Sequence, residues 1–491
     1  MTSPTTRTLA LSVLLPGFTG TTPPPWVRRA LAEGMAGVCL FGQNVEGPEQ
    51  LRALTRALRV ERRDVLVASD EEGGSVTRLD AGLGSPWPGA ATLGALDDVD
   101  ATRAVARGLG RQARAAGVDL VLAPVLDVNS EPDNPVIGER SFGATPDLVS
   151  RHGVAFVRGL QDAGVTACAK HFPGHGATRT DSHVGLPVVE VDEATWRARD
   201  LPPFAAAVAA GVPTVMTAHV VVRPLDAEPA TLSAPVLRIL REELGFDGVV
   251  VSDALDMRAI ADGVGRAGGA VHALAAGVDL LCVGNPVFPD GYDEEAVLEE
   301  IVDAVVAAVD DGTLPLARLE EASRRVAALD RGDRDGSDEP EDRDAMLVQG
   351  AAVARRALAV TGDVRVDGDV LVIVPRPVAG YAAGHKPSAL LAELQRRRPG
   401  WTYVEVADEQ RAAAEARAAA GRPVAVVAEG ADGRRTAALA GAILAAAPDA
   451  VVVYGGLRRD DDPGTRTVHT HGTGAATAVA AADVLLGEGT A

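Results

Sequence analysis

Short apolar runs alternate with helical patterns along the first two thirds of the chain, and this alternation constrains the fold more than any other feature. Amphipathic or Ala-rich patterns typical of helices lie at 25–35, 105–117 and 202–211. Continuous apolar strands separated by helices are typical of a parallel sheet that is buried on both faces. Eight runs favour a closed (β/α)8 barrel of the TIM type, with an open doubly wound sheet as the alternative. The expected strands are 9–15, 37–42, 64–69, 119–128, 166–170, 214–219, 248–253 and 277–284.

A second domain is expected after the barrel. The barrel domain, residues 1–329, ends with a helical pattern at 315–329, and the charged, Gly-containing residues 330–344 are typical of a linker. Residues 345–491 repeat the strand–helix alternation and end in an Ala-rich helix near 475–486. We therefore expect an α/β sandwich with a mostly parallel sheet. It contains neither a Gly-x-Gly-x-x-Gly nor a Walker-type loop, so no nucleotide site is predicted.

Charge and cysteine content limit the classes of partner and the compartment. A formal net charge of −21 argues against a general nucleic-acid binder and against binding to anionic membranes. No apolar stretch reaches transmembrane length, and the run 9–18 lacks a small-x-small cleavage site, so we interpret it as a core strand rather than a signal sequence. The three cysteines all lie in apolar runs, which favours free thiols in a reducing compartment. We expect a cytoplasmic monomer.

One loop concentrates the polar side chains. Residues 166–183, TACAKHFPGHGATRTDSH, pass from an apolar strand into a Pro/Gly loop that carries a Lys, three His and an Asp. Lys170 is one of only two lysines in a chain rich in arginine, and an ammonium is a compact donor that Arg cannot replace. Six polar residues, including two of this loop, follow expected strands and so lie at one end of the expected barrel. Barrels of this type carry their active sites at that end. These residues are Asp70, Arg140, Lys170, His171, His219 and Asp253.

The motifs in this region resemble those of glycoside hydrolase family three, in its β-N-acetylhexosaminidase branch. KHFPGHG followed by DSH carries the resemblance. ASDEEGGSVTRL, NPVIGERSFG, MTAHVVV, PATLS and VVSDALDM stand in the family's order. The resemblance is strong over roughly residues 9–330 and looser over the remainder, and it implies a two-domain glycosidase without metal or organic cofactor. Ala254 stands where the family's β-glucosidases carry Trp, which points to N-acetylglucosamine at the cleaved position.

Asp253 is the expected nucleophile. Retaining glycoside hydrolysis needs a carboxylate on one face of the sugar and a proton donor near the leaving oxygen. Asp253 ends an expected strand and matches the family's catalytic Asp in the motif SDA-L. The alternative is an Asp that caps the following helix. Asp256 is less favoured because it is expected on the first turn of that helix.

The resemblance implies a histidine, His183, as the acid/base in place of a second carboxylate. Asp181 and His183 are alternate residues of an expected extended stretch and face the same way, so Asp181 can bond one ring nitrogen and fix the tautomer. The alternative is a loop Asp-x-His pair with a local structural bond. Near its ordinary pKa an imidazole can give and then take a proton around neutral pH.

The remaining site residues are expected to bind sugar or to support those that do. Lys170 and His171 match the family's binders of sugar hydroxyls, and Asp70 matches the acid that holds the outer hydroxyls. Arg78 and Arg140 match binding positions, although a structural ion network is the alternative for Asp70 and both arginines. Two further histidines of these motifs, His175 and His219, are expected behind the site. His175 should shape its loop through backbone bonds, because Phe-Pro-Gly forbids the helix of an H-x-x-x-H metal site; for His219, simple packing stays open.

Together these features predict a retaining exo-β-N-acetylglucosaminidase. It would remove terminal β-linked GlcNAc from peptidoglycan fragments or chitooligosaccharides through a covalent intermediate on Asp253. Two alternatives stay open. A β-N-acetylglucosaminide phosphorylase would use phosphate at the second step, which a His acid/base permits because it does not repel phosphate. A non-catalytic sugar-binding protein would require a lost nucleophile or His–Asp pair, and this chain has both.

Overall fold

The structure is a computed structural model that divides into two compact units. It describes residues 5–287, 291–330, 341–376, 388–419, 421–429 and 433–488. The first unit comprises Met1–Glu71, Thr102–Asn134 and Ala144–Glu341. The second comprises Glu72–Ala101, Pro135–Gly143 and Asp342–Ala491, so two segments from the first half of the chain pack with the C-terminal part. The linker expected at 330–344 lies largely outside the described residues, and the domain boundaries stay a prediction.

A parallel sheet in the form of a half-barrel makes up the core of the first unit. Six strands pair in the order β11-β9-β7-β6-β3-β2, and β1 pairs in parallel with β12. An isolated bridge between Val251 and Leu280 links the region of β11 to that of β12. The strands are β1 (Leu14–Pro16), β2 (Gly37–Leu40), β3 (Leu66–Ser69), β6 (Leu120–Val121), β7 (Thr166–Phe172), β9 (Thr214–Thr217), β11 (Val249–Val251) and β12 (Leu281–Gly284). Their buried side chains include Cys39, Leu66, Leu120, Cys168, Met216 and Val249, which form one apolar cluster.

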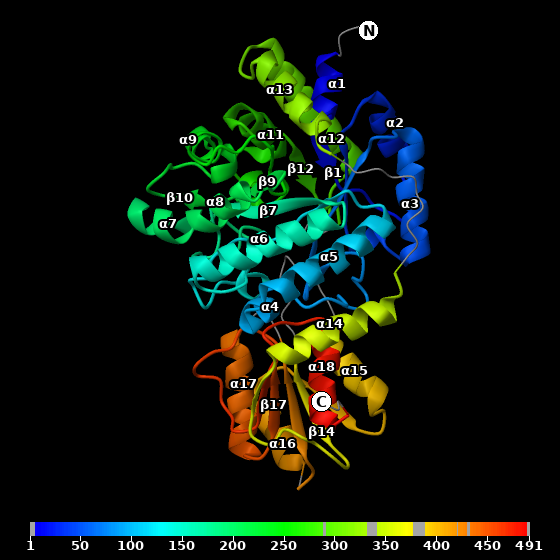
Figure 1. Ribbon diagram of the computed structural model, residues 1–491, viewed down its shortest axis with the longest axis vertical. Helices are drawn as coiled ribbons and strands as arrows, with labels where there is room; N and C mark the ends of the chain where they lie inside the picture. The colour runs from blue at the N-terminus through cyan, green and yellow to red at the C-terminus, as the bar shows by residue number, and fades with distance from the viewer. Residues whose placement is uncertain are drawn as a thin grey trace. The chain divides into compact units, whose positions relative to one another are not determined.

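Helices follow the strands along the chain, as seen in Figure 1. The longer ones bury apolar side chains on one face, as Leu51, Leu54 and Leu58 do in Pro48–Glu61. They include α2 (Pro25–Glu33), α3 (Pro48–Glu61), α5 (Val99–Ala116), α6 (Pro146–Asp162), α7 (Glu193–Arg199), α8 (Leu201–Ala209), α9 (Ala234–Arg238), α10 (Arg258–Ala261), α11 (Gly265–Ala276), α12 (Glu294–Asp310) and α13 (Leu316–Ala327). Two short parallel strands, β8 (Val188–Val189) and β10 (Val221–Val222), pair outside the main sheet.

The first expected strand is partly wrong. Residues Thr6–Leu11 form the helix α1, and only Leu14–Pro16 are extended. Thr5 caps this helix by accepting a hydrogen bond from the Thr8 amide at 3.2 Å. A short apolar run fits a buried helix turn as well as a strand, and the capping residue decides between them.

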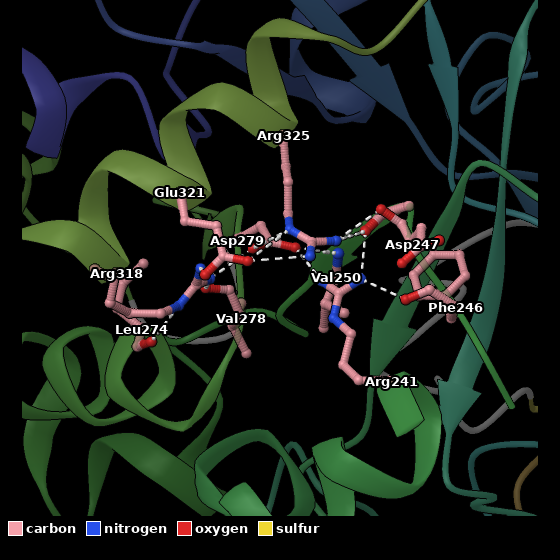
Figure 2. Close-up of polar contacts among 11 residues, drawn as sticks. Arg241, Phe246, Asp247, Val250, Leu274, Val278, Asp279, Arg318, Glu321 and Arg325 are labelled. Atoms are coloured by element: carbon pink, nitrogen blue, oxygen red, sulfur yellow. Dashed lines mark hydrogen bonds and ion pairs between the residues drawn. The ribbon is translucent and has the colours of Figure 1, made fainter. Parts of the chain in front are cut away.

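Buried aspartates stabilise the amino ends of the strands, and Figure 2 shows the contacts of one of them, Asp279. Asp279, just before β12, accepts the Val250 amide of β11 at 3.0 Å and is paired with the guanidinium groups of Arg241 and Arg318. Asp119, just before β6, makes the equivalent bond to the Val67 amide at 2.8 Å. Both occur in the sequence GVDL, so the same device joins neighbouring strands at two places. In parallel α/β sheets with chemistry at the carboxyl ends of the strands, the amino ends contribute to stability.

The second unit contains a six-stranded sheet with helices on both faces (Figure 1). The order is β13-β18-β17-β16-β14-β15, and all pairs are parallel except β13–β18. One apolar cluster packs helices α15 and α18 on the sheet, and another packs α16 and α17 on the opposite face. The strands are β13 (Ala359–Thr361), β14 (Leu371–Pro375), β15 (Thr402–Val406), β16 (Val424–Ala428), β17 (Val451–Tyr454) and β18 (Thr467–His469); the helices are α4 (Ala90–Leu96), α14 (Arg343–Ala357), α15 (Ala389–Arg397), α16 (Glu409–Ala418), α17 (Gly433–Ala446) and α18 (Ala475–Leu486).

Among the residues described, no helix combines the length and the apolar character that crossing a bilayer requires.

Candidate active site

Polar side chains gather at the carboxyl ends of the parallel strands of the first unit. Lys170, near the end of β7, is only 2% exposed, and its Nζ lies 2.7 Å from Oδ1 of Asp70, which follows β3. An ammonium taken out of water needs such a partner, because burial of an isolated charge is costly. The Asp70 side chain remains 17% exposed, so this ion pair faces the solvent-accessible end of the sheet.

Asp127, at the end of the run that contains β6, organises the loop after β7. Its Oδ2 lies 2.7 Å from Nδ1 of His171, and its Oδ1 accepts the backbone amides of His171 and His175 at 3.3 and 2.7 Å. Burial by itself raises the pKa of the Asp127 carboxyl, but the charge and hydrogen bond of His171, aided by His175, hold it below its ordinary value. Sequence reasoning missed this residue, although its position at a strand end was visible.

His175 shapes the loop through its backbone, which bonds Asp127 and Asn134, and through its ring, which bonds two hydroxyl groups. Its Nδ1 lies 2.7 Å from Oγ1 of Thr178, and its Nε2 lies 3.1 Å from Oγ of Ser182. Burial lowers the pKa of His175 to about 4, so the ring is neutral at physiological pH. The rings of His171 and His175 are 6.3 Å apart and edge to face, each bonded to its own partner. No cluster of three or more His, Cys, Asp or Glu suited to a metal ion occurs within the described ranges.

His183 and Asp181 are hydrogen-bonded, but in a turn rather than an extended stretch. Oδ1 of Asp181 lies 2.7 Å from Nδ1 of His183 and also accepts the His183 amide at 2.9 Å. Burial raises the pKa of Asp181, but the hydrogen bond and charge of His183 outweigh this effect and lower it below its ordinary value. The carboxylate therefore holds a proton on Nδ1, which leaves Nε2 as the nitrogen that can exchange one.

Asp253 follows β11 and does not cap a helix. Its Oδ1 accepts the amide of the next residue, Ala254, at 2.8 Å, whereas α10 begins only at Arg258. Burial raises the pKa of Asp253, but the nearby histidines, first His219 and then His171, and the Ala254 amide lower it below its ordinary value. The group is thus an ionised carboxylate at neutral pH. This geometry removes the capping alternative.

His219, which follows β9, holds the backbone next to Asp253. Its Nε2 lies 2.9 Å from the carbonyl oxygen of Ala254, and its Nδ1 lies 2.8 Å from Oγ1 of Thr231. Burial lowers the pKa of His219, so the ring is neutral near pH 7. Because a carbonyl oxygen only accepts, the ring proton is on Nε2, which donates to Ala254. His219 therefore restrains the Asp253–Ala254 turn and does not merely fill space.

Asp256 is a second carboxyl beside Asp253 that sequence reasoning undervalued. It lies in the turn before α10 rather than in its first turn, and its Oδ2 accepts the Asn285 amide at 2.7 Å. Burial raises the pKa of Asp256 to about 7, with the charge of Asp253 acting in the same direction. The Tyr292 hydroxyl is hydrogen-bonded to this carboxyl. In the sequence, its position three residues after Asp253 could have indicated that the two carboxyl groups lie close together.

Arg78 and Arg140 belong to the second unit. Arg140 forms a two-pronged ion pair with Glu72, with nitrogen–oxygen distances of 2.8 and 2.9 Å, and both side chains are less than 10% exposed. Such a pair is a structural ion network in its own right. Arg78 follows β5 (Val76–Thr77) and is half-buried. Their predicted binding of sugar stays a prediction.

The first unit thus brings together a carboxylate, an imidazole–carboxylate pair and an ammonium–carboxylate pair. His219, His171 and His183 each contribute to lowering the pKa of Asp253, as expected of side chains that lie near it. A nucleophilic carboxylate with a proton donor nearby suits displacement at an acetal carbon.

Comparisons with known proteins agree with this chemistry. Residues 27–329 match the model of the glycosyl hydrolase family 3 N-terminal domain. Beta-hexosaminidase A of Pseudoalteromonas piscicida is 34% identical over 334 residues, which are 63% of this chain and only 55% of that protein. A beta-hexosaminidase of Methylococcus capsulatus is 40% identical over 252 residues, 51% of this chain and 75% of the relative.

A solved structure resembles nearly the whole chain. It is a glycoside hydrolase family 3 beta-N-acetylglucosaminidase from Paenibacillus sp. str. FPU-7, with a TM-score of 0.87 and 31% identity. The alignment covers 99% of this chain and 98% of that one.

Proposed function

Because the chain belongs to glycosyl hydrolase family 3 and is a glycoside hydrolase, we propose that it removes terminal β-linked N-acetylglucosamine with retention of configuration. The observation that carries the proposal is the His183–Asp181 pair within electrostatic reach of the ionised Asp253. We infer the sugar from the names of the relatives. The relatives in sequence are named beta-hexosaminidases, and the solved structure that matches nearly the full length is named a beta-N-acetylglucosaminidase.

In the first step, Asp253 attacks the anomeric carbon while His183 protonates the departing oxygen. The Ala254 amide and the restraint from His219 fix the direction of the attacking carboxylate. Asp181 holds Nδ1–H of His183, so the proton given to the leaving group comes from Nε2. The products of this step are the free aglycone and a glycosyl ester on Asp253.

In the second step, the neutral His183 accepts a proton from water through Nε2, and the resulting hydroxide displaces Asp253 from the sugar. The imidazole is thereby returned to its protonated form. Lys170 and Asp70, with His171 held by Asp127, are placed to bind the sugar hydroxyls. Two displacements at the same carbon give retention.

Asp256 is the main rival as proton donor. A carboxyl with a pKa near 7 has the property expected of a general acid. However, the Asn285 amide and the Tyr292 hydroxyl already bond its oxygens. We therefore assign the proton transfer to His183, whose ring is 21% exposed and is held through Nδ1 by Asp181.

A phosphorylase is the second candidate function. An imidazole acid/base does not repel an incoming phosphate as a carboxylate would, so the His183–Asp181 pair permits phosphate in place of water. The aglycone under either reaction would come from peptidoglycan fragments or chitooligosaccharides.

We also propose that the strands of the first unit close into a complete (β/α)8 barrel. The β1–β12 pair and the Val251–Leu280 bridge support closure at one side. On the other side, the Ala36 amide donates a hydrogen bond of 3.0 Å to the Leu11 carbonyl. Ala36 directly precedes β2 and Leu11 lies shortly before β1, so this bond supports the two strands being neighbours. A cytoplasmic, monomeric enzyme remains our proposal, and the free, buried Cys39, Cys168 and Cys282 are consistent with a reducing compartment.

The deciding experiment is hydrolysis of p-nitrophenyl β-N-acetylglucosaminide with and without phosphate. The hydrolase predicts nitrophenol and β-configured N-acetylglucosamine as the first-formed sugar, by NMR, at a rate that phosphate leaves unchanged. N-acetylglucosamine 1-phosphate as the main product would establish the phosphorylase instead. Absence of cleavage, with the corresponding glucoside cleaved, would refute the assigned sugar.

A further inference from the structure

Arg266 places an uncompensated positive charge at the carboxyl end of the sheet. It is the second residue of α11, on the segment that leads away from Asp253. Its Nε is buried without a hydrogen-bond partner, and no hydrogen bond or ion pair joins its guanidinium to any residue that the structure describes. By contrast, the guanidinium groups of Arg140 and Arg318 are paired with carboxylates. A guanidinium without a carboxylate or carbonyl partner is costly to bury, so an acceptor on a ligand that reaches it would be bound favourably.

Tyr292 fixes the plane of this guanidinium. Cζ of Arg266 lies 4.5 Å from the centroid of the Tyr292 ring, within range of a cation–π contact. The Tyr292 hydroxyl is bonded to Asp256, whose Oδ2 is in turn held by the Asn285 amide. The guanidinium is therefore preoriented by a chain of contacts that leaves its own donors unused.

Asp256 does not cancel the charge of Arg266 under mildly acidic to neutral conditions. Burial raises the pKa of Asp256 to about 7, so this carboxyl is largely neutral below that pH. The titratable groups whose charges act on it are Arg266, His183 and Asp253, with Tyr292 and Cys282 also close. Arg266 thus lies within electrostatic range of the same carboxyl as the acid/base and the nucleophile.

Arg266 lies on the side of the departing group rather than that of the bound sugar. The ion pair of Asp70 and Lys170 sits at the ends of β3 and β7, whereas Arg266 follows β11. In the sheet order β11-β9-β7-β6-β3, β11 and β3 are four positions apart. His183, which would protonate the leaving oxygen, is tied to the β11 side, because the Ala259 amide donates to the Ser182 carbonyl at 3.3 Å.

We propose that Arg266, stacked on Tyr292, binds an oxyanion of the aglycone, so that the enzyme prefers leaving groups that are acidic sugars over neutral ones. A guanidinium fork matches a carboxylate with two parallel hydrogen bonds. The inference rests on the proposed function and selects, among its aglycones, one with a carboxylate such as the lactyl group of muramic acid. A charge-assisted contact of this kind is expected to favour the acidic substrate about 10- to 100-fold.

The test measures a ratio of kcat/KM for two substrates that differ only in charge. These are N-acetylglucosaminyl-β-1,4-N-acetylmuramic acid and its methyl ester, and the ratio is determined for the parent, Arg266→Met, Arg266→Lys and Arg238→Met. Arg238 is an exposed arginine of α9, so its variant removes the same charge without touching the site. Circular dichroism and thermal melts verify that each variant is folded.

We expect the parent to prefer the acid about 10- to 100-fold, Arg266→Met to lose this preference, and Arg238→Met to keep it. Arg266→Lys should keep part of this preference, because lysine retains the positive charge but lacks the two parallel donors of the guanidinium group. Equal use of acid and ester by the parent, or an unchanged ratio in folded Arg266→Met, would overturn the proposal. Arg266-dependent formation of N-acetylglucosamine 1-phosphate without preference for the acid would also overturn it, in favour of phosphate as the bound anion. Cleavage of the nitrophenyl substrate keeps the proposed function standing in each of these cases.

Discussion

Replacement of Asp256 by Asn should stabilise the protein at alkaline pH and leave its stability at acidic pH nearly unchanged. The neutral form of Asp256 has a carbonyl oxygen to accept the Asn285 amide and a hydroxyl beside Tyr292. An Asn side chain reproduces both the acceptor and the lack of charge. The variant therefore imitates the protonated state and cannot ionise.

The sign and size of this stability change follow from the pKa of the Asp256 carboxyl. Burial raises the pKa of Asp256 from 3.8 to about 7, so the folded state holds the proton more tightly than the unfolded state does. As pH rises from about 4 to 7, the parent loses stability because the unfolded chain ionises first. A difference of about three pKa units at about 1.4 kcal/mol each gives an upper limit of about 4 kcal/mol. Solvent reaches part of this side chain, so we expect a gain of about 1–3 kcal/mol in the variant above pH 7.

The assay is thermal melting of the parent, Asp256→Asn and Asp262→Asn between pH 5 and 8.5. Asp262 is an exposed aspartate just after α10 and serves as the control for loss of charge. The Asp256 variant should gain a few degrees at pH 8 relative to the parent, and about none at pH 5. A gain of the same size at both pH values, or an equal gain in the Asp262 variant, would refute the raised pKa as its cause.

Four further outcomes are expected. Asp253→Ala should lower kcat by several orders of magnitude with an unchanged melting temperature, and activity within tenfold of the parent would remove it from the mechanism. His183→Ala, and Asp181→Asn more weakly, should reduce kcat/KM for chitobiose far more than for the nitrophenyl glycoside, because a phenolate departs with little proton help; equal losses would assign His183 to binding. Asp127→Asn should raise KM and cost about 1–3 kcal/mol of stability, measured by kinetics and urea unfolding, because it weakens the bonds that hold His171. Asp279→Ala should cost about 3–5 kcal/mol in urea unfolding, with kcat/KM of the folded fraction unchanged, since it leaves buried guanidinium groups unpaired.

The positions of most strands of the first unit could be predicted because they depend on pattern alone, although the run expected at 119–128 forms a strand only at Leu120–Val121. The apolar run before Lys170 is continuous, and the Pro/Gly loop that follows marks its end, so β7 and its polar residues were located from the sequence. The helix α18 was likewise predicted near its observed bounds, 475–486, because the segment is rich in Ala, the strongest helix former. The error at residues 9–11 arose where the run was too short to show a period.

Contacts that depend on turn geometry could not be predicted. The His183–Asp181 bond was expected for a wrong reason, since a turn and not strand alternation brings the two side chains together. Asp127 was missed because its role is to accept backbone amides of a loop far along the chain, which no local pattern records. Asp256 was undervalued because its pKa depends on enclosure by Asn285 and Tyr292, from the loop after another strand.

The two ends of the half-barrel treat buried charge in opposite ways, and this difference separates stability from chemistry. At the amino end, Asp279 has its oxygens fully engaged by a backbone amide and two guanidinium groups, so it has no capacity left for a ligand. At the carboxyl end, Asp253 accepts one described hydrogen bond, from its own neighbour, and Arg266 has none among the described residues. Groups that are held in position but incompletely hydrogen-bonded bind a substrate most favourably. Folding has already removed them from water, so that free-energy cost is not incurred again on binding. The location of such groups, rather than the number of charges, therefore identifies the reactive end of this sheet.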